Sequence, residues 1–445
     1  MKWIKHRFFV VWLVLFAFVC GIFIYLFKLG FYGEKWATYP TNKHIFNEGV
    51  IVKAGKITDK NDIVLAETVD RKRVYNSDVN IRKSTVHTVG DLKGFVSTGM
   101  QSAYLKELCG YDAVNGVYNI SGKGNNISLT LDSNLCTKAL KQLGEYSGSV
   151  GIYNYKTGEI VCMVSTPTFD PAKSDVKEEK GVYVNRFISG VYAPGSIFKL
   201  VTALSALENI KNVNDVHFTC NRGVTIEGEW LSCLGNHKTI DMDKGLTFSC
   251  NAFFAQMAIK LGKNNLTATA EKVGFNKQLK MDGIECAKSE YNVKNSRNID
   301  FGWSGIGQHN DLVNPYQFIS FMGAIANDGV SVSPYVINKI TNSAGIKIRG
   351  AKKSENRLLS SENAKILTEM MHNNVNRNYS TYFNDIKVCG KTGTAEVGDK
   401  ATPHSWFTGF IDDEQKPYAF AIVVENAGMG KGIALKIASK MLKEL

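Results

Sequence analysis

The pattern of apolar and polar positions divides the chain into an anchor, a short spacer region and one larger domain. Residues Phe8 to Phe27 carry no charge over 20 positions, which is the length of a helix that crosses a hydrocarbon core. The next stretch alternates short β-like runs with polar turns, and its apolar residues are too sparse for a large core. We therefore expect a cytoplasmic N-terminus (1–7), a transmembrane anchor (8–28), a membrane-proximal domain (29–125) and a larger domain (126–445).

Basic residues indicate how this anchor is oriented. Lys2, Lys5 and Arg7 precede it, and positive charge is typical of the cytoplasmic side. Everything after Lys28 is therefore expected outside the membrane. A cleaved signal peptide is the alternative, but its apolar region would be shorter and would end in small residues, whereas this one ends in bulky residues up to Phe27.

Strand-like segments lie at both ends of the larger domain, and helical segments lie between them. The predicted strands are 127–132, 149–155, 159–165, 386–394, 405–411 and 417–425, and predicted helices include 134–143 and 433–445. From Ser196 to about Ser380 most segments have helical periodicity, so we expect a helical layer there. This order predicts an α/β fold in which the first and last strands meet in one sheet, with a helical subdomain beside it.

Composition and charge narrow the function only slightly. With 44% apolar and 21% charged residues among 445, the chain is ordinary globular protein with room for a large core. The net charge of +12 indicates either a solvated basic surface or attraction to anionic lipid or wall polymer. Nucleic acid is not an expected partner of an exported chain.

The cysteines do not predict a disulfide framework. Their number, nine, is odd, and Cys20 lies in the anchor. Cys220 and Cys233 bracket a glycine-containing loop and are the one pair we would nominate, with scattered free thiols as the alternative. We find no Cys–His pattern with zinc spacing, and we expect neither a metal nor another cofactor.

The stretch from Tyr192 to Lys199 carries the strongest chemical signal. Pro194 and Gly195 end the preceding element, so Ser196 lies at the N-cap or in the first turn of an apolar helix. Three residues are nearly one helical turn, which places the Ser196 hydroxyl and the Lys199 amine on the same side. The unpaired N–H groups of a first turn also tolerate negative charge. We infer a nucleophile next to a base.

Two further short patterns accompany this pair, and each has copies elsewhere. The two are Ser-x-Asn at Ser249 and Asn251, and Lys-Thr-Gly at Lys391, Thr392 and Gly393, while Ser196 and Lys199 themselves form a Ser-x-x-Lys pattern. Ser-x-x-Lys recurs at Ser174 and Lys177, in a polar run that we interpret as a solvated loop. Ser-x-Asn and Lys-Thr-Gly also recur, so any one motif alone is weak and its residues are as well explained by caps or surface charges.

The order of the three patterns, each on the expected kind of element, is far more specific than any one of them. It is the order of β-lactamases and penicillin-binding proteins, and the chain resembles a class B penicillin-binding protein over most of its length. The resemblance implies the penicillin-binding transpeptidase fold, an antiparallel sheet flanked by helices with a helical subdomain, after a small membrane-proximal domain and one membrane helix. No domain of glycosyltransferase size precedes it, so the resemblance also implies a SEDS-family membrane glycosyltransferase as partner.

The resemblance implies a peptidoglycan D,D-transpeptidase that β-lactams inhibit and whose substrates are stem peptides ending in D-Ala-D-Ala. Its implied catalytic residues are the nucleophile Ser196, the neutral base Lys199, the proton relay Ser249 and the second amine Lys391. Its implied substrate contacts are Asn251 for an amide carbonyl, Thr392 and Thr394 for the terminal carboxylate, Gly393 for close approach of the peptide, and the backbone N–H groups of Ser196 and Thr394 as the oxyanion hole.

Some features depart from the family pattern and leave alternatives open. Ile197 replaces a common threonine, Cys250 fills the variable middle position of Ser-x-Asn, and the spacer is short. A D,D-carboxypeptidase, a β-lactamase, a penicillin sensor and a non-catalytic scaffold that activates a glycosyltransferase are the competing functions. His404 and Glu425 lie at strand ends, and we interpret both as structural.

Overall fold

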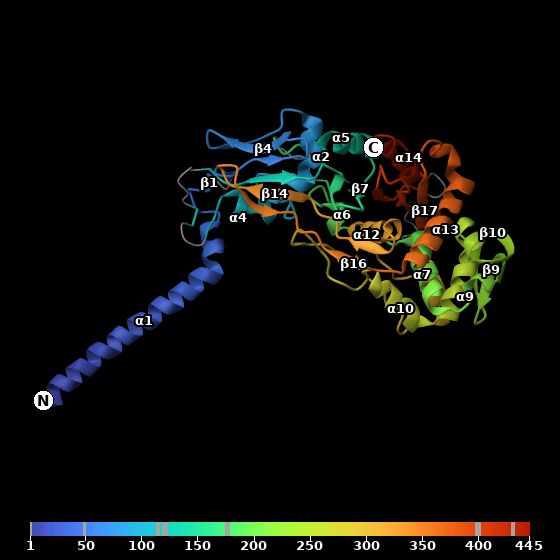
Figure 1. Cartoon of the computed structure of the whole chain (residues 1–445), viewed down its shortest axis with the longest axis horizontal. Helices are drawn as coiled ribbons and strands as arrows, with labels where there is room; N and C mark the ends of the chain where they lie inside the picture. Colours follow the sequence, from blue (N-terminus) through green and yellow to red (C-terminus); the bar gives the residue numbers. More distant parts are fainter. Residues whose placement is uncertain are drawn as a thin grey trace.

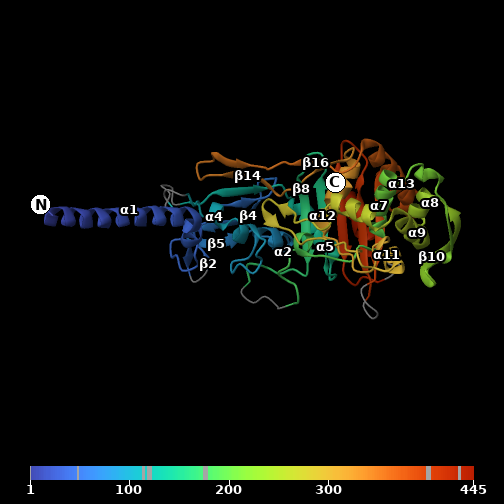
Figure 2. The same ribbon diagram turned by 90° about the horizontal axis from the view of Figure 1, so that it is seen from below.

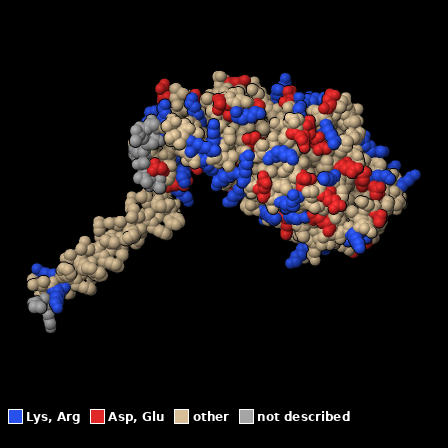
Figure 3. All heavy atoms as spheres, in the orientation of Figure 1, with Lys and Arg blue, Asp and Glu red and all other residues tan. Residues whose placement is uncertain are grey.

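The computed structural model describes residues 2–47, 50–112, 116–117, 123–173, 179–396, 402–428 and 432–445. Helix α1 (Lys2–Ala37) projects away from the rest of the molecule (Figures 1 and 2). Within the described residues it is the one helix that is long and apolar enough to cross a membrane. Figure 3 shows basic side chains at its free end, whereas basic and acidic side chains are interspersed over the visible face of the body.

The body is built around a five-stranded antiparallel sheet in the order β17-β18-β19-β7-β8. Its strands are β7 (Gly148–Asn154), β8 (Ile160–Thr166), β17 (Val388–Ala395), β18 (His404–Ile411) and β19 (Tyr418–Val424). The predicted strands lie within two residues of these bounds, and the first and last do meet, because β19 pairs with β7. The predicted fold class is therefore confirmed.

Helices pack against this sheet, which explains why its strands are buried along nearly their whole length. Helices α5 (Ser133–Leu143) and α14 (Ile433–Leu442) pack on each other and on β8, β18 and β19. Helix α12 (Pro315–Ala326) contacts β7, β18 and β19, and α13 (Ser361–Tyr379) contacts β17. The sheet and these helices form the rigid support of the site described below.

A second sheet crosses the domain boundary expected at residue 125. Its order is β15-β14-β6-β3-β4-β5, so strands from the membrane-proximal segment pair with strands from much later in the chain. The strands are β3 (Ile57–Thr58), β4 (Val64–Val69), β5 (Lys72–Tyr75), β6 (Asn126–Leu129), β14 (Ile337–Thr341) and β15 (Lys347–Gly350). The membrane-proximal region is thus completed by strand pairing from the larger domain, which is how a segment with few apolar residues is stabilised.

The segment 196–380 is less helical than its periodicity predicts. The hairpin of β9 (Phe218–Ile226) and β10 (Glu229–Ile240) lies against α9 (Asn251–Leu261). The prediction of an essentially helical region was wrong here because most hairpin side chains face solvent. The copy of Ser-x-x-Lys at Ser174 and Lys177 lies outside the described residues.

The remaining elements are short or connect those already described. They are β1 (Phe46–Asn47), β2 (Val50–Ile51), α2 (Val79–Val89), α3 (Met100–Ala103), α4 (Leu105–Leu108), α6 (Arg186–Ser189), η1 (Gly195–Ile197), α7 (Lys199–Asn209), η2 (Val213–Asp215), α8 (Met242–Thr247), α10 (Lys263–Lys272), β11 (Lys280–Met281), β12 (Ile284–Glu285), α11 (Asn298–Ser304), β13 (Val330–Val332), β16 (Glu355–Arg357) and η3 (Ser380–Tyr382).

Candidate active site

Ser196 lies in η1, a 3-10 helix of one turn. Only Phe198 separates η1 from the start of α7. Gly195 has a positive φ of 54°, and a Cβ on it would lie 2.3 Å from the Thr394 carbonyl oxygen. Glycine is therefore required for η1 to lie against β17. The turn is also held by the Gly195 N–H, which donates to the Gly307 carbonyl at 2.8 Å. The serine consequently stands where a helix begins and next to the edge strand of the main sheet.

The Lys199 side chain is fully buried and points back at this serine. Its Nζ lies 3.0 Å from Ser196 Oγ, 2.7 Å from the Ser249 carbonyl oxygen and 2.7 Å from Asn251 Oδ1. Burial lowers the pKa of Lys199 to about 8, because removal from water disfavours the charged form, while Cys233 and Cys250 act in the opposite direction. A substantial neutral fraction exists near physiological pH.

Ser249 connects Lys199 to the second lysine. It precedes α9 with a positive φ of 51°, and its Oγ lies 3.2 Å from Lys199 Nζ and 2.9 Å from Lys391 Nζ. Lys391 is fully buried on β17, and burial lowers the pKa of its amine, with the Lys199 charge adding to the effect. The three motifs thus bring two amines and two hydroxyls together from three separate parts of the chain.

The remaining predicted residues on β17 divide between its two faces. Thr392 and Thr394 line the cavity at Ser196, and Thr392 Oγ1 is 2.9 Å from the Tyr379 hydroxyl. Gly393 faces η1 instead: a Cβ there would lie 2.8 Å from the Pro194 carbonyl oxygen. A side chain at this position would therefore collide with η1, and close approach of a substrate peptide stays a prediction from the resemblance.

The site opens into a cavity of about 590 Å³. Its lining is Ser196, Ser232, Cys233, Leu234, His237, Phe248, Ser249, Asn251, Trp303, Ile306, Gln308, His309, Tyr379, Thr392, Thr394 and Glu396. Ser196, Thr392 and Thr394 are among its polar residues, while Leu234, Trp303 and Ile306 supply apolar surface. Such a mixed lining suits a ligand with both polar and apolar parts.

His404 and Glu425 make structural contacts. Glu425 Oε1 accepts hydrogen bonds from Arg186 Nε at 2.8 Å and from the Tyr192 hydroxyl at 3.1 Å, and so ties the segment before Ser196 to β19. His404 Nδ1 accepts from the Asn426 N–H at 3.2 Å. Neither residue lines the cavity, in agreement with the interpretation from sequence.

Sequence reasoning missed Tyr379 and a cluster of sulfur and imidazole atoms. Cys220, Cys233, His237 and Cys250 place one ligand atom each within 4.8 Å of one another, and all cysteines in the described residues are free thiols. The nominated Cys220 and Cys233 pair is thus part of a larger group. No short Cys–His motif identifies the cluster, because the hairpin and the start of α9 assemble it.

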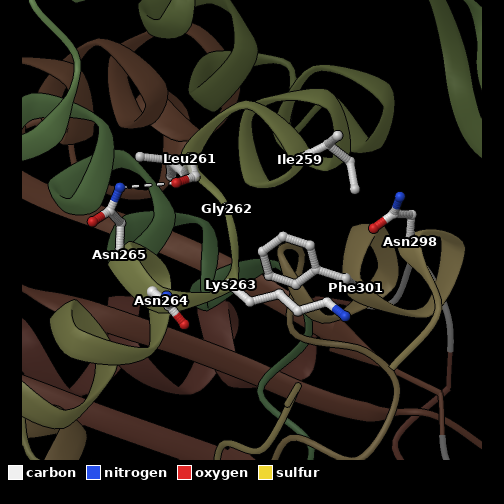
Figure 4. A pocket seen from close by; sticks show the side chains of 8 residues that line it. All are labelled: Ile259, Leu261, Gly262, Lys263, Asn264, Asn265, Asn298 and Phe301. Carbon is white, nitrogen blue, oxygen red and sulfur yellow. Dashed lines mark hydrogen bonds between the residues drawn. The ribbon is translucent and has the colours of Figure 1, made fainter. Parts of the chain in front are cut away.

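A second cavity, of about 490 Å³, lies where α9 ends and α10 begins (Figure 4). Its lining is Ile259, Leu261, Gly262, Lys263, Asn264, Asn265, Asn298 and Phe301. Lys263 Nζ donates to the Ser296 carbonyl at 2.6 Å, and Asn265 Nδ2 donates to the Leu261 carbonyl at 2.9 Å. None of the predicted site residues belongs to this lining, so we do not connect it with the reaction.

A serine beside two buried lysines, at the edge of an antiparallel sheet flanked by helices, defines the class of serine acyltransferases that includes the penicillin-binding proteins. The profile of the penicillin binding protein transpeptidase domain matches residues 148–443. The chain belongs to this family, and the resemblance inferred from motif order is confirmed.

Named relatives agree with this assignment. The chain is 26% identical over 374 residues to the peptidoglycan D,D-transpeptidase PbpA of Mycolicibacterium smegmatis, covering 75% of this chain and 76% of the relative. It is 23% identical to penicillin-binding protein A of M. tuberculosis, solved as a ceftriaxone acyl-enzyme complex, with a TM-score of 0.79 over 88% of this chain and 98% of that one. The D,D-transpeptidase domain of a peptidoglycan glycosyltransferase from Eggerthella lenta is 25% identical, with a TM-score of 0.76 over 88% and 98% of the two chains.

Proposed function

We propose that this protein is a peptidoglycan D,D-transpeptidase in which Ser196 forms the acyl-enzyme. The observation that carries the proposal is the position of Lys199 Nζ, which lies 3.0 Å from Ser196 Oγ in a fully buried environment. A serine hydroxyl is a weak nucleophile until a base takes its proton. A surface lysine or a simple N-cap serine would not require this burial.

Hydrogen bonding orients the base. A neutral amine has two N–H groups, and those of Lys199 have strong acceptors in the Ser249 carbonyl and Asn251 Oδ1, each at 2.7 Å. The nitrogen lone pair is then left for the proton of Ser196 Oγ. As Oγ attacks the carbonyl carbon between the two D-Ala residues, this proton passes to Lys199.

Collapse of the tetrahedral intermediate breaks the D-Ala–D-Ala amide bond and leaves the penultimate residue esterified to Ser196. The leaving amine needs a proton, which Ser249 Oγ is placed to give, since it lies within 3.2 Å of both lysine amines. Those amines then restore the proton on Ser249. The backbone N–H groups of Ser196 and Thr394 serve as the oxyanion hole for the negative oxygen.

Substrate contacts follow from the cavity lining. Thr392 and Thr394 offer hydroxyls to the terminal carboxylate. Asn251 Nδ2 donates one proton to the Ser232 carbonyl at 3.2 Å and keeps a second for a substrate carbonyl. Deacylation reverses the proton transfers. An amine of a neighbouring stem peptide attacks the ester carbonyl and passes its proton to Ser249 Oγ, which is hydrogen-bonded to both lysine amines. As the ester C–O bond breaks, Lys199 returns a proton to Ser196 Oγ, so the serine is released as a hydroxyl.

The membrane arrangement and the partner extend this proposal. Basic residues at the free end of α1 favour a cytoplasmic N-terminus, which places the catalytic domain outside the membrane. This orientation is tested by introducing single cysteines before and after α1 and measuring their reaction with a membrane-impermeant maleimide.

A transpeptidase needs a polymerised glycan as its substrate, so we propose a SEDS-family glycosyltransferase as partner.

The reaction is tested with the full chain in detergent, a D-Ala-D-Ala stem peptide and an added amine acceptor. We expect D-Ala release with transfer of the acyl group to the amine, and no release by Ser196→Ala. Release into water alone would identify a carboxypeptidase, and hydrolysis of penicillin with turnover would identify a β-lactamase. Normal cross-linking in cells that depend on Ser196→Ala would make the protein a scaffold.

A further inference from the structure

The cluster of three cysteines and one histidine lies beside the site, between the β9–β10 hairpin and α9. Cys220 comes from β9, Cys233 and His237 come from β10, and Cys250 is the N-cap of α9. The pairing of β9 with β10 shifts register between Ser232 and Lys238. On a regular strand, residues four apart face the same side but lie about 13 Å from each other. The irregularity brings the Cys233 and His237 side chains together, with 3.6 Å between Sγ and Nδ1.

The distances within the cluster are those of four ligands around one ion. His237 Nδ1 lies 3.6 Å from Cys220 Sγ and 3.6 Å from Cys233 Sγ, and Cys233 Sγ lies 3.9 Å from Cys250 Sγ. Tetrahedral zinc with ordinary Zn–S and Zn–N bonds separates two sulfurs by about 3.8 Å and a sulfur from a nitrogen by about 3.6 Å. The His237 ring is also held in place, because it stacks on Phe248 at a centroid distance of 5.2 Å.

One backbone contact fits a thiolate ligand: the Phe253 N–H donates to Cys250 Sγ at 3.4 Å. A sulfur atom that accepts an N–H group carries negative charge well. Cys220 Sγ lies 3.4 Å from the Gly235 carbonyl oxygen, which accepts the thiol proton until a metal ion displaces it. Soft thiolates and an imidazole are a ligand set that selects zinc over magnesium or calcium.

We propose that Cys220, Cys233, His237 and Cys250 bind one structural Zn²⁺ ion that joins the hairpin to the Ser-x-Asn motif. Binding displaces the three thiol protons and forms three Zn–S bonds and one Zn–N bond, with no oxidation or reduction. All four positions are protein ligands, so the ion has no open site for substrate and takes no part in acyl transfer.

The position of Cys250 gives this ion a role at the acylation site, and this part rests on the proposed function. Cys250 stands between Ser249 and Asn251, whose side chains both contact Lys199. On the other side, Ser232, next to Cys233, accepts a hydrogen bond from Asn251 Nδ2. An ion held by Cys233 and Cys250 therefore fixes the loop that carries the relay serine and the substrate-binding amide.

A disulfide is the competing state, because Cys233 Sγ and Cys250 Sγ lie only 3.9 Å apart. It would remove two ligands and exclude the ion. The same residues therefore allow two distinguishable chemistries, and a measurement of metal content together with thiol state separates them.

The test measures zinc per chain by mass spectrometry in the full-length protein, purified in detergent and dialysed against metal-free buffer. We expect one zinc per chain in the wild type, less than a tenth of that in Cys220→Ser, and full occupancy in Cys286→Ser, which removes a buried thiol outside the cluster. Ser196→Ala should retain zinc, so failure of the metal site is separable from failure of the proposed reaction.

Replacement of zinc by Co²⁺ in the wild type keeps the test independent of how the variants fold. We expect the visible absorption of tetrahedral cobalt and a thiolate charge-transfer band in the near ultraviolet. A reduced wild-type chain that binds neither ion, or a Cys233–Cys250 disulfide found by peptide mapping, would overturn the proposal. Zinc occupancy with an unchanged penicillin acylation rate after chelation would uphold the site and overturn its positioning role.

Discussion

The two sides of the cavity are held in different ways. On one side, Lys199 and Lys391 are completely buried, and η1, α7 and β17 that carry the reacting groups pack into the core. On the other, the β9–β10 hairpin exposes Leu234 to 95% and Trp230 to 55%. Core packing fixes the nucleophile and its base, whereas the hairpin has few buried side chains and meets α9 through a small apolar cluster around Ile226 and Leu231 and through the proposed metal ligands. Substitutions on the two sides should therefore act differently.

Removal of the buried base should have the largest effect. In Lys199→Met a side chain of similar length keeps the space filled, but no group takes the proton from Ser196, so penicillin acylation should slow by about 10²- to 10⁴-fold. Stopped-flow measurement with a fluorescent penicillin reads the rate. Lys260→Met changes an exposed lysine on α9 and should leave the rate within about twofold of the wild type. A Lys199→Met rate within tenfold of wild type would contradict the assignment of the base.

The pH dependence of the same rate sharpens this result. Because burial lowers the pKa of Lys199 to about 8 and only the neutral amine accepts a proton, the wild-type rate should rise with pH through about 8 and level off above it. Below that pH the neutral fraction falls about tenfold per pH unit. Lys199→Met should lose this step. A wild-type rate that falls as pH rises from 6 to about 8 would show that the protonated amine is the active form.

Gly195→Ala tests whether packing of η1 on β17 places the nucleophile. Its Cβ would meet the Thr394 carbonyl oxygen at 2.3 Å, so the turn must shift, and a displacement of about 1 Å costs roughly 10²-fold in rate. Gly262→Ala is the matched control, since Gly262 also has a positive φ, 77°, but its Cβ would have nothing within 4 Å. The control should lose about 1 kcal/mol of stability and keep its acylation rate. Equal rate losses in both variants would attribute the effect to backbone strain alone.

A smaller effect is expected at the wall formed by α13. Tyr379→Phe removes the hydroxyl that lies 2.9 Å from Thr392 Oγ1. Loss of one hydrogen bond of about 1 kcal/mol should lower kcat/KM for a stem peptide by about fivefold, because Thr392 then has more freedom at the carboxylate site. Tyr382→Phe, outside the cavity lining, serves as control. An unchanged kcat/KM would mean that Tyr379 does not position Thr392.

The smallest effect should come from the exposed hairpin. Leu234→Ser changes a side chain that lines the cavity but is almost wholly in solvent, so the free energy of unfolding should change by less than about 0.5 kcal/mol. Acylation by penicillin should stay within about threefold. A loss of several kcal/mol in thermal or chemical unfolding would show that Leu234 makes stabilising apolar contacts that its exposure does not indicate.

The sequence predicts the main sheet well because its strands are strongly apolar and nearly continuous. Segments such as 149–155 and 405–411 have no competing helical interpretation, and the order of the three motifs identifies Ser196, Lys199 and Lys391 through a pattern of residues. The approach of Ser249 to both amines required the fold, since the serine lies 50 residues from Lys199 and 142 residues from Lys391.

The hairpin and the cysteine cluster illustrate what periodicity leaves out. In β9 only Cys220, Gly223 and Ile226 are buried, so the strand shows a spacing of three instead of the alternation expected of a strand. The cluster depends on a register shift in that hairpin and on the start of α9, neither of which is visible in the spacing of cysteines. The contact of Gly393 with η1 likewise depends on the fold, because Pro194 and Ile197 lie far from it in the sequence.

The most direct test of the acylation centre is peptide mapping after exposure of the full chain to a labelled penicillin. The account predicts one stable adduct per chain, on the peptide that contains Ser196, and no adduct in Ser196→Ala. A folded wild-type chain that gives no adduct, or an adduct on another residue, would contradict it.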